Sequence, residues 1–169
     1  MLAIHPIPAF NDNYIWAIIN NDAKQAIIVD AGDAAPVLDF LQKNNLNICQ
    51  IWVTHHHQDH IGGVAELANI YPNAQIFAHV DIHPLVKAKN LQAAREGSEL
   101  TAWGCPVQVW QVAGHTDNHL AYLLTLEQHL HVFCGDTLFR AGCGRVFTGT
   151  IEQLFESFER FAELHDEQT

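Results

Sequence analysis

The chain has 169 residues, of which 49% are hydrophobic and 16% are charged, and this composition predicts a folded globular domain rather than a disordered chain. Asp and Glu outnumber Lys and Arg by 19 to 8, so the formal net charge is −11. We expect no nucleic-acid partner, because phosphate recognition depends on cationic side chains. Histidine is unusually frequent, with 12 residues, and it is the commonest metal ligand in proteins.

The start of the chain lacks the features of a secretion signal. No cationic segment precedes an apolar run there, and Pro6 and Pro8 interrupt the first apolar residues. No apolar stretch approaches the roughly 18 residues that a membrane span needs. The four cysteines form no C-x-x-C pair, which favours reduced thiols over a disulfide framework. These features predict a cytoplasmic protein with no membrane partner, which we expect to be a monomer.

The first half of the chain alternates between strand and helix patterns. Two β-rich segments, 14–19 and 26–29, bracket a polar turn and predict a hairpin. Residues 36–41 have helical apolar spacing, 48–53 has the pattern of a short buried strand, and 61–70 continues helically after two glycines. This alternation is typical of a mixed α/β fold.

The second half adds further strands and a final helix. Its predicted strands are residues 75–78, 107–112, 120–126 and 130–134. Residues 84–96 are expected to be helical. Thr150 with Gln153 three residues later has the pattern of a capping box, which predicts an amphipathic helix from this point.

A histidine-rich segment, Thr54–His60, comes directly after a predicted buried strand. In extended backbone, alternate side chains share a side, so His55 and His57 can converge on one metal ion. Asp59 and His60, beyond the bend, can turn toward a second ion. The segment therefore predicts a metal site at a strand end, with glycines 62 and 63 allowing a sharp turn after it.

Two later strands run into the same arrangement of a glycine and a polar ligand type. One leads to Gly-His-Thr at 114–116 and the other to Gly-Asp-Thr at 135–137. The carboxylate of Asp136 has two oxygens and can bridge two cations. Taken alone, either triplet is also typical of an ordinary turn.

Together these residues resemble the metallo-β-lactamase superfamily, whose pattern is H-x-H-x-D-H, then a His, then a bridging Asp. The matching residues are His55, His57, Asp59, His60, His115 and Asp136. Within that superfamily the sequence is most similar to the glyoxalase II, or hydroxyacylglutathione hydrolase, family. The further matching segments are residues 7–16, 29–33, 134–139 and 141–150, the last of which contains Gly-Cys-Gly-Arg.

The resemblance implies an αββα sandwich of two mixed sheets flanked by helices. It implies two divalent metal ions, for which zinc is expected and iron or manganese are alternatives. The first ion would be held by His55, His57 and His115, the second by Asp59 and His60, and Asp136 would bridge both. The implied reaction is hydrolysis of S-D-lactoylglutathione to D-lactate and glutathione.

Further roles come from the same resemblance. Asp59 and Asp136 are expected to be catalytic as well as metal-binding. Arg145 and Phe147 are expected to contact the glutathione part of the substrate, and His119 to form hydrogen bonds near the metals.

The sequence departs from the family pattern at three points. Asn118 replaces a glycine, Phe147 stands where the family often has Tyr, and the chain ends at Thr169, before the strand that carries the last His ligand. Residues 1–169 are therefore expected to form an incomplete catalytic domain without the helical substrate-binding domain, and the last-ligand role is not assigned to His165. Two alternatives remain open: a persulfide dioxygenase-like enzyme with one iron, and a fragment that binds metal without turnover.

Overall fold

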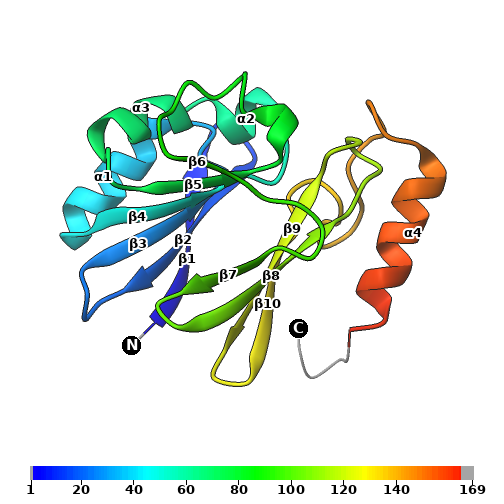
Figure 1. Ribbon diagram of the computed structural model, residues 1–169. Coiled ribbons are helices and arrows are strands. Elements are labelled where there is room, and N and C mark those ends of the chain that lie inside the picture. Colours follow the sequence, from blue (N-terminus) through cyan, green and yellow to red (C-terminus); the bar gives the residue numbers. More distant parts are fainter. Residues whose placement is uncertain (1, 165–169) are drawn as a thin grey trace. The chain divides into compact units, whose positions relative to one another are not determined.

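A computed structural model describes residues 2–164 of the chain (Figure 1). The described residues fall into two compact units, which divide after Ala93, and each unit contains its own β-sheet. Within residues 2–164, no helix combines the length and the apolar character needed to cross a membrane.

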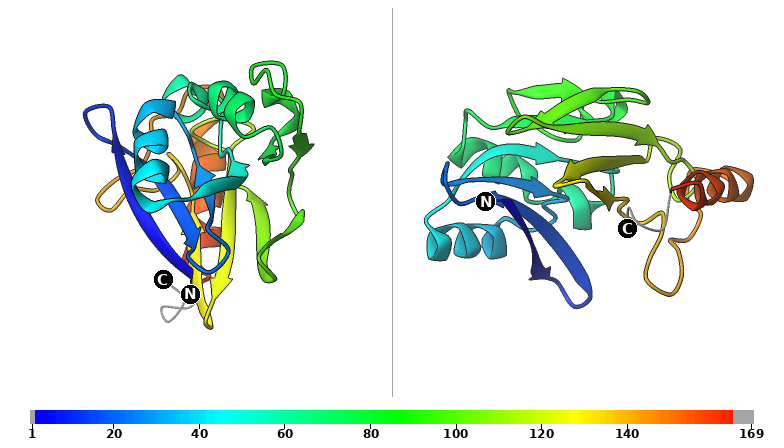
Figure 2. Two further views of the ribbon diagram at one scale, coloured as in Figure 1. Left: turned by 90° about the vertical axis from the view of Figure 1, so that its left-hand side faces the viewer. Right: turned by 90° about the horizontal axis from the view of Figure 1, so that it is seen from below.

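The first unit contains a six-stranded sheet whose strands are neighbours in the order of the chain. They are β1 (Leu2–Ala9), β2 (Asn13–Asn20), β3 (Gln25–Val29), β4 (Asn47–Trp52), β5 (Gln75–Ala78) and β6 (Leu91–Ala93). The first three strands pair antiparallel, whereas β3 to β6 pair in parallel. Figure 2 shows the long β1–β2 pair from two further directions.

Helices α1 (Ala34–Asn44) and α3 (Val64–Ile70) lie along one side of this sheet, together with the short α2 (Gln58–Ile61) (Figure 1). The 3-10 turn η1 (Val80–Ile82) comes after β5. The core of the unit joins buried strand residues such as Ile28 to helix residues such as Val37 and Leu67. Because β3 and β4 are parallel, their carboxyl ends meet at the same edge of the sheet. The chain leaves β4 at that edge to enter the histidine-rich segment.

The second unit contains a four-stranded sheet in the order β10-β9-β8-β7, with antiparallel pairing throughout its described strands. These strands are β7 (Glu99–Ala102), β8 (Cys105–Gln111), β9 (Leu120–Leu126) and β10 (His129–Phe133). Helix α4 (Ile151–Ala162) comes last and begins with a capping box, in which the side chains of Thr150 and Gln153 each accept from the backbone N–H of the other. This start of α4 confirms the capping pattern in the sequence.

The expected α/β fold with two sheets and flanking helices is confirmed, and the second sheet is antiparallel rather than mixed. The helix expected at 84–96 is wrong. This stretch is irregular up to β6, whose residues Leu91–Ala93 pair with Ile76–Ala78 of β5. Pairing with a neighbouring strand overrides a weak local helix preference.

Candidate functional site

The histidine-rich segment of the first unit brings ring nitrogens together immediately after β4. The Nε2 atom of His55 lies 3.1 Å from Nδ1 of His57. The side chain of His55 is fully buried, and its Nδ1 lies 3.0 Å from the hydroxyl of Thr54. The two imidazoles therefore direct one nitrogen each toward a common point, as the alternation along the strand predicted.

Asp59 and His60 form a second pair in the same segment. The Oδ2 atom of Asp59 lies 3.5 Å from Nε2 of His60 and accepts a hydrogen bond of 2.9 Å from the Nδ2 amide of Asn13. The rings of His60 and His55 are 4.1 Å apart, centroid to centroid. The first unit thus places His55, His57, Asp59 and His60 in one cluster.

Asp30, at the end of β3, orients this cluster. Its carboxylate accepts hydrogen bonds from the backbone N–H and from the hydroxyl of Thr54, both at 2.8 Å. Its Oδ2 also lies 3.0 Å from Nδ1 of His60, and Asp30 is only 6% exposed. Sequence reasoning assigned no role to Asp30 or Asn13. The feature that points to Asp30 is its position directly after β3. This strand runs parallel to β4, which leads into the histidine-rich segment.

The glycines near this cluster permit close backbone contact. A Cβ on Gly32 would lie 1.8 Å from the carbonyl oxygen of Asp59, and one on Gly62 would lie 2.6 Å from the carbonyl oxygen of Gly32. Gly62 has an ordinary helical backbone, with φ −56°. Position 62 therefore requires glycine because the backbone there packs closely against the backbone of Gly32. The sharp turn that the sequence suggested is not the reason.

In the second unit, His115 comes after β8 and is 2% exposed. Its Nδ1 lies 2.6 Å from the carbonyl oxygen of Arg145, so the N–H at that position donates to the carbonyl. Its Nε2 is 3.5 Å from Oδ2 of Asp136. The hydrogen bond to Arg145 thus leaves the lone pair of Nε2 facing a carboxylate oxygen.

His119 contacts the backbone of Asp136. The N–H of Asp136 donates to Nε2 of His119 at 3.3 Å, while Nδ1 of His119 lies 3.1 Å from the carbonyl oxygen of Leu120. The His119 side chain is fully buried. Its two contacts require the neutral ring with the proton on Nδ1, and they fix the position of residue 136.

Gly144, in the Gly-Cys-Gly-Arg turn, packs directly against both His115 and Asp136. Its N–H donates to the carbonyl oxygen of Asp136 at 2.9 Å, and a Cβ at this position would lie 2.1 Å from that oxygen and 2.6 Å from Nδ1 of His115. Gly142, two residues earlier, has no atom within 4 Å of an added Cβ. The turn therefore supports His115 and Asp136 through Gly144.

This contrast supplies a test within one motif. We expect Gly144→Ala to destabilise the protein by about 1–3 kcal/mol, because overpacked sites force the backbone to shift. Gly142→Ala is the matched control, with an expected change within about 0.5 kcal/mol. Urea unfolding of both variants measures the difference, and equal stabilities would contradict the close contact at Gly144.

The two residues expected to contact substrate both lie on the surface of the second unit. Arg145 is exposed, and Phe147 is 61% exposed, with its ring 5.2 Å from the ring of His115 in an edge-on arrangement. The backbone N–H of Phe147 donates to the carbonyl oxygen of His115 at 3.0 Å. Both side chains are therefore available to a ligand near His115.

The chemistry of these donors suits divalent transition metals. The polar contacts at Nδ1 of His55, His60 and His115 each favour the tautomer whose lone pair is on Nε2. Nitrogen from imidazole together with carboxylate oxygen is the donor set typical of zinc, iron and related ions. Each unit thus holds side chains that fit metal ligation.

Comparisons with known proteins agree with this chemistry. The family model described as "Metallo-beta-lactamase superfamily" matches residues 11–167. A hydroxyacylglutathione hydrolase of Neisseria meningitidis serogroup A is 46% identical over 163 residues, which are 96% of this chain and 62% of that protein. One from Vibrio campbellii is 46% identical over 167 residues, which are 99% of this chain and 63% of that protein.

The fold is also similar to a solved structure, that of ETHE1 from Myxococcus xanthus. The TM-score is 0.80 at 26% sequence identity, and the match covers 99% of this chain and 72% of the other. The chain spans a little over three fifths of the length of the curated relatives that it matches.

Proposed function

The chain belongs to the metallo-beta-lactamase superfamily, and from this premise we propose that it is the metal-binding catalytic part of a hydroxyacylglutathione hydrolase. The reaction is hydrolysis of S-D-lactoylglutathione to D-lactate and glutathione. The observation that carries the proposal is the donor geometry of three histidines, His55, His60 and His115, whose contacts at Nδ1 favour the tautomer with its lone pair on Nε2. The names of the curated relatives support the choice of substrate.

The proposed metal ligands are the six residues that match the family pattern. His55, His57 and His115 would hold the first ion, and Asp59 and His60 would hold the second. Asp136 would be shared by the two, because its carboxylate has two oxygens. Zinc is the proposed metal, and iron or manganese suit the same donors.

When bound, such a metal pair lowers the pKa of water toward neutrality and polarises a carbonyl oxygen. The chain's own residues orient the ligands and handle the proton. Asp59, whose Oδ2 accepts a hydrogen bond from the amide of Asn13, is the residue that would accept a proton from water. The leaving thiolate needs no strong acid, because thiols ionise near pH 8.5.

The test combines metal analysis with a thioester assay on the full chain. Two bound divalent ions together with release of glutathione from S-D-lactoylglutathione support the proposal. Two bound ions without hydrolysis, in a chain extended to the length of the relatives, would contradict it. Oxygen uptake with glutathione persulfide and no thioester hydrolysis would instead indicate the dioxygenase alternative.

Arg145 is proposed to bind a glutathione carboxylate. We expect Arg145→Ala to lower kcat/KM for the glutathione thioester by about 10-fold, since a hydrogen bond to a charged group contributes roughly 1.5–3 kcal/mol. A thioester without the glutathione carboxylates should be hardly affected. Arg140→Ala, an exposed cation in the same region, serves as the control. Equal losses on both thioesters would remove the recognition role from Arg145.

The remaining predictions about the cellular context rest on the sequence. A cytoplasmic location and a monomeric state belong to this proposal. Measurement of the molecular mass in solution by light scattering tests the second of them.

A further inference from the structure

The segment that leads from β8 to His115 is held by α4 through consecutive contacts. The Nη1 atom of Arg160 donates to the carbonyl oxygen of Gln111 at 2.8 Å, and the hydroxyl of Ser157 donates to the carbonyl oxygen of Ala113 at 2.7 Å. Gly114, with φ +142°, lies so close to Leu154 that an added Cβ would be 2.5 Å from its Cα. Three successive turns of one helix thus contact three of the four residues before His115.

Arg160 is itself fixed from two sides. Its guanidinium makes two hydrogen bonds of 3.0 Å to the carboxylate of Glu96 and lies over the ring of Trp110, 4.4 Å from the ring centroid. Glu96 in turn accepts from the N–H of Gln111 at 2.7 Å. Burial alone would raise the pKa of Glu96, but the hydrogen bonds from Arg160 and Gln111 and the charge of Arg160 lower it below its usual value. The backbone N–H and the backbone carbonyl of Gln111 are therefore both hydrogen-bonded to the Glu96–Arg160 ion pair.

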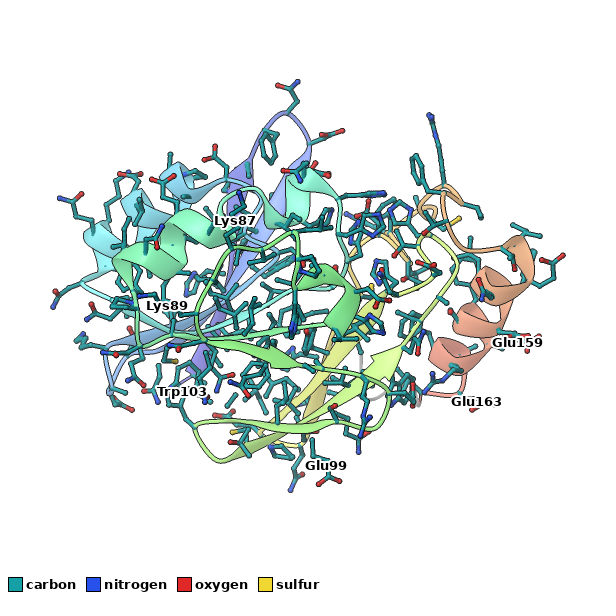
Figure 3. The ribbon with its side chains drawn as sticks, turned by 45° about the horizontal axis from the view of Figure 1, so that its top comes forward. Lys87, Lys89, Glu99, Trp103, Glu159 and Glu163 are labelled. Atoms are coloured by element: carbon teal, nitrogen blue, oxygen red, sulfur yellow. The ribbon has the colours of Figure 1, made fainter. Side chains whose placement is uncertain are left out.

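The loop before α4 reinforces the same segment. The backbone of Arg145 and Phe147 is hydrogen-bonded to His115, and a Cβ on Gly149 would lie 2.4 Å from the carbonyl oxygen of Gly114. The capping box at Thr150 connects this loop to the start of α4. Glu159 and Glu163 lie on the exposed side of the helix (Figure 3), so the contacts of α4 with this segment come from its other face.

We propose that Ser157 and Arg160 are positioning residues for the metal centre. Their hydrogen bonds to the carbonyl groups of Gln111 and Ala113 fix the position of the backbone that leads into His115. The position of this backbone in turn sets the direction of Nε2 of His115. Neither residue is among the proposed metal ligands or substrate contacts. The inference rests on the proposed function, since it requires His115 to be a metal ligand.

The test measures the affinity for Co²⁺ by competition with a chelator, together with the visible d–d spectrum of the bound ion. The variants are Ser157→Ala and Arg160→Met. Phe155→Ala, on the exposed face of the same helix, is the matched control for α4, because this side chain is 60% exposed. Ile48→Ala, a buried position at the start of β4, is the control for a general loss of stability. His115→Ala reports directly on the ligand.

We expect Ser157→Ala and Arg160→Met each to weaken Co²⁺ binding by about 10-fold and to alter the d–d spectrum, since residues that orient ligands contribute 10–100-fold in metal affinity. Phe155→Ala and Ile48→Ala should bind as the parent chain does. If His115→Ala weakens binding and the two α4 variants do not, the positioning role is overturned while the proposed ligands stand. If His115→Ala leaves affinity and spectrum unchanged, both the ligand assignment and the positioning role fail.

Discussion

Replacing Asp136 with Ala is expected to release both metal ions and to lower the rate of thioester hydrolysis by about 10³-fold or more. A bridging carboxylate is the only proposed ligand shared by the two ions, so its loss weakens both. Activation of water by bound metal contributes several kcal/mol to catalysis, and each 1.36 kcal/mol corresponds to a factor of ten in rate. Metal content after gel filtration and the initial rate measure the two effects.

The fold should survive this substitution. The backbone N–H of residue 136 still donates to His119, and its carbonyl still accepts from Gly144. Asp136→Asn is a sharper variant, because it keeps the shape of the side chain but has one oxygen in place of two. If either variant retains both ions at full occupancy, Asp136 is not the bridging ligand.

The parts of the candidate site that the sequence predicted are the local ones. The spacing along the segment predicts how its metal-binding side chains are arranged. His55 and His57 lie on one side of an extended segment, and Asp59 and His60 come after a bend. Nothing beyond those four residues and the preceding strand was needed to expect the cluster that the first unit contains.

The residues that the sequence did not indicate act over long separations. Asp30 and Thr54 are 24 residues apart, and Asn13 and Asp59 are 46 apart. Their contacts depend on which strands become neighbours, and short-range patterns do not encode that. The wrong helix at 84–96 has the same cause, since β6 exists because it pairs with β5.

Asp30→Ala is expected to destabilise the protein by about 3–5 kcal/mol and to weaken metal binding by about 10–100-fold. The carboxylate is buried, accepts hydrogen bonds from the N–H and the hydroxyl of Thr54, and lies 3.0 Å from Nδ1 of His60. Its removal leaves both donors of Thr54 without this acceptor and removes the negative charge beside His60. Residue 30 also has φ +55°, which alanine tolerates less well than aspartate. Chemical unfolding and Co²⁺ titration measure the two losses.

Asp30→Asn separates the two effects. Asparagine fits the left-handed backbone and its oxygen can still accept from the N–H of Thr54, so the loss of stability should be smaller than in Asp30→Ala. Its amide nitrogen, however, faces the hydroxyl of Thr54 and Nδ1 of His60, which are themselves donors. The proton of His60 then moves to Nε2, the atom that faces Asp59, and the lone pair for the metal is lost.

Asp30→Asn should therefore lose nearly as much metal affinity as Asp30→Ala, whereas Leu67→Ala, an equally destabilising core change, should lose none. Parent-like Co²⁺ binding by Asp30→Asn would show that Asp30 supports the fold and not the tautomer of His60.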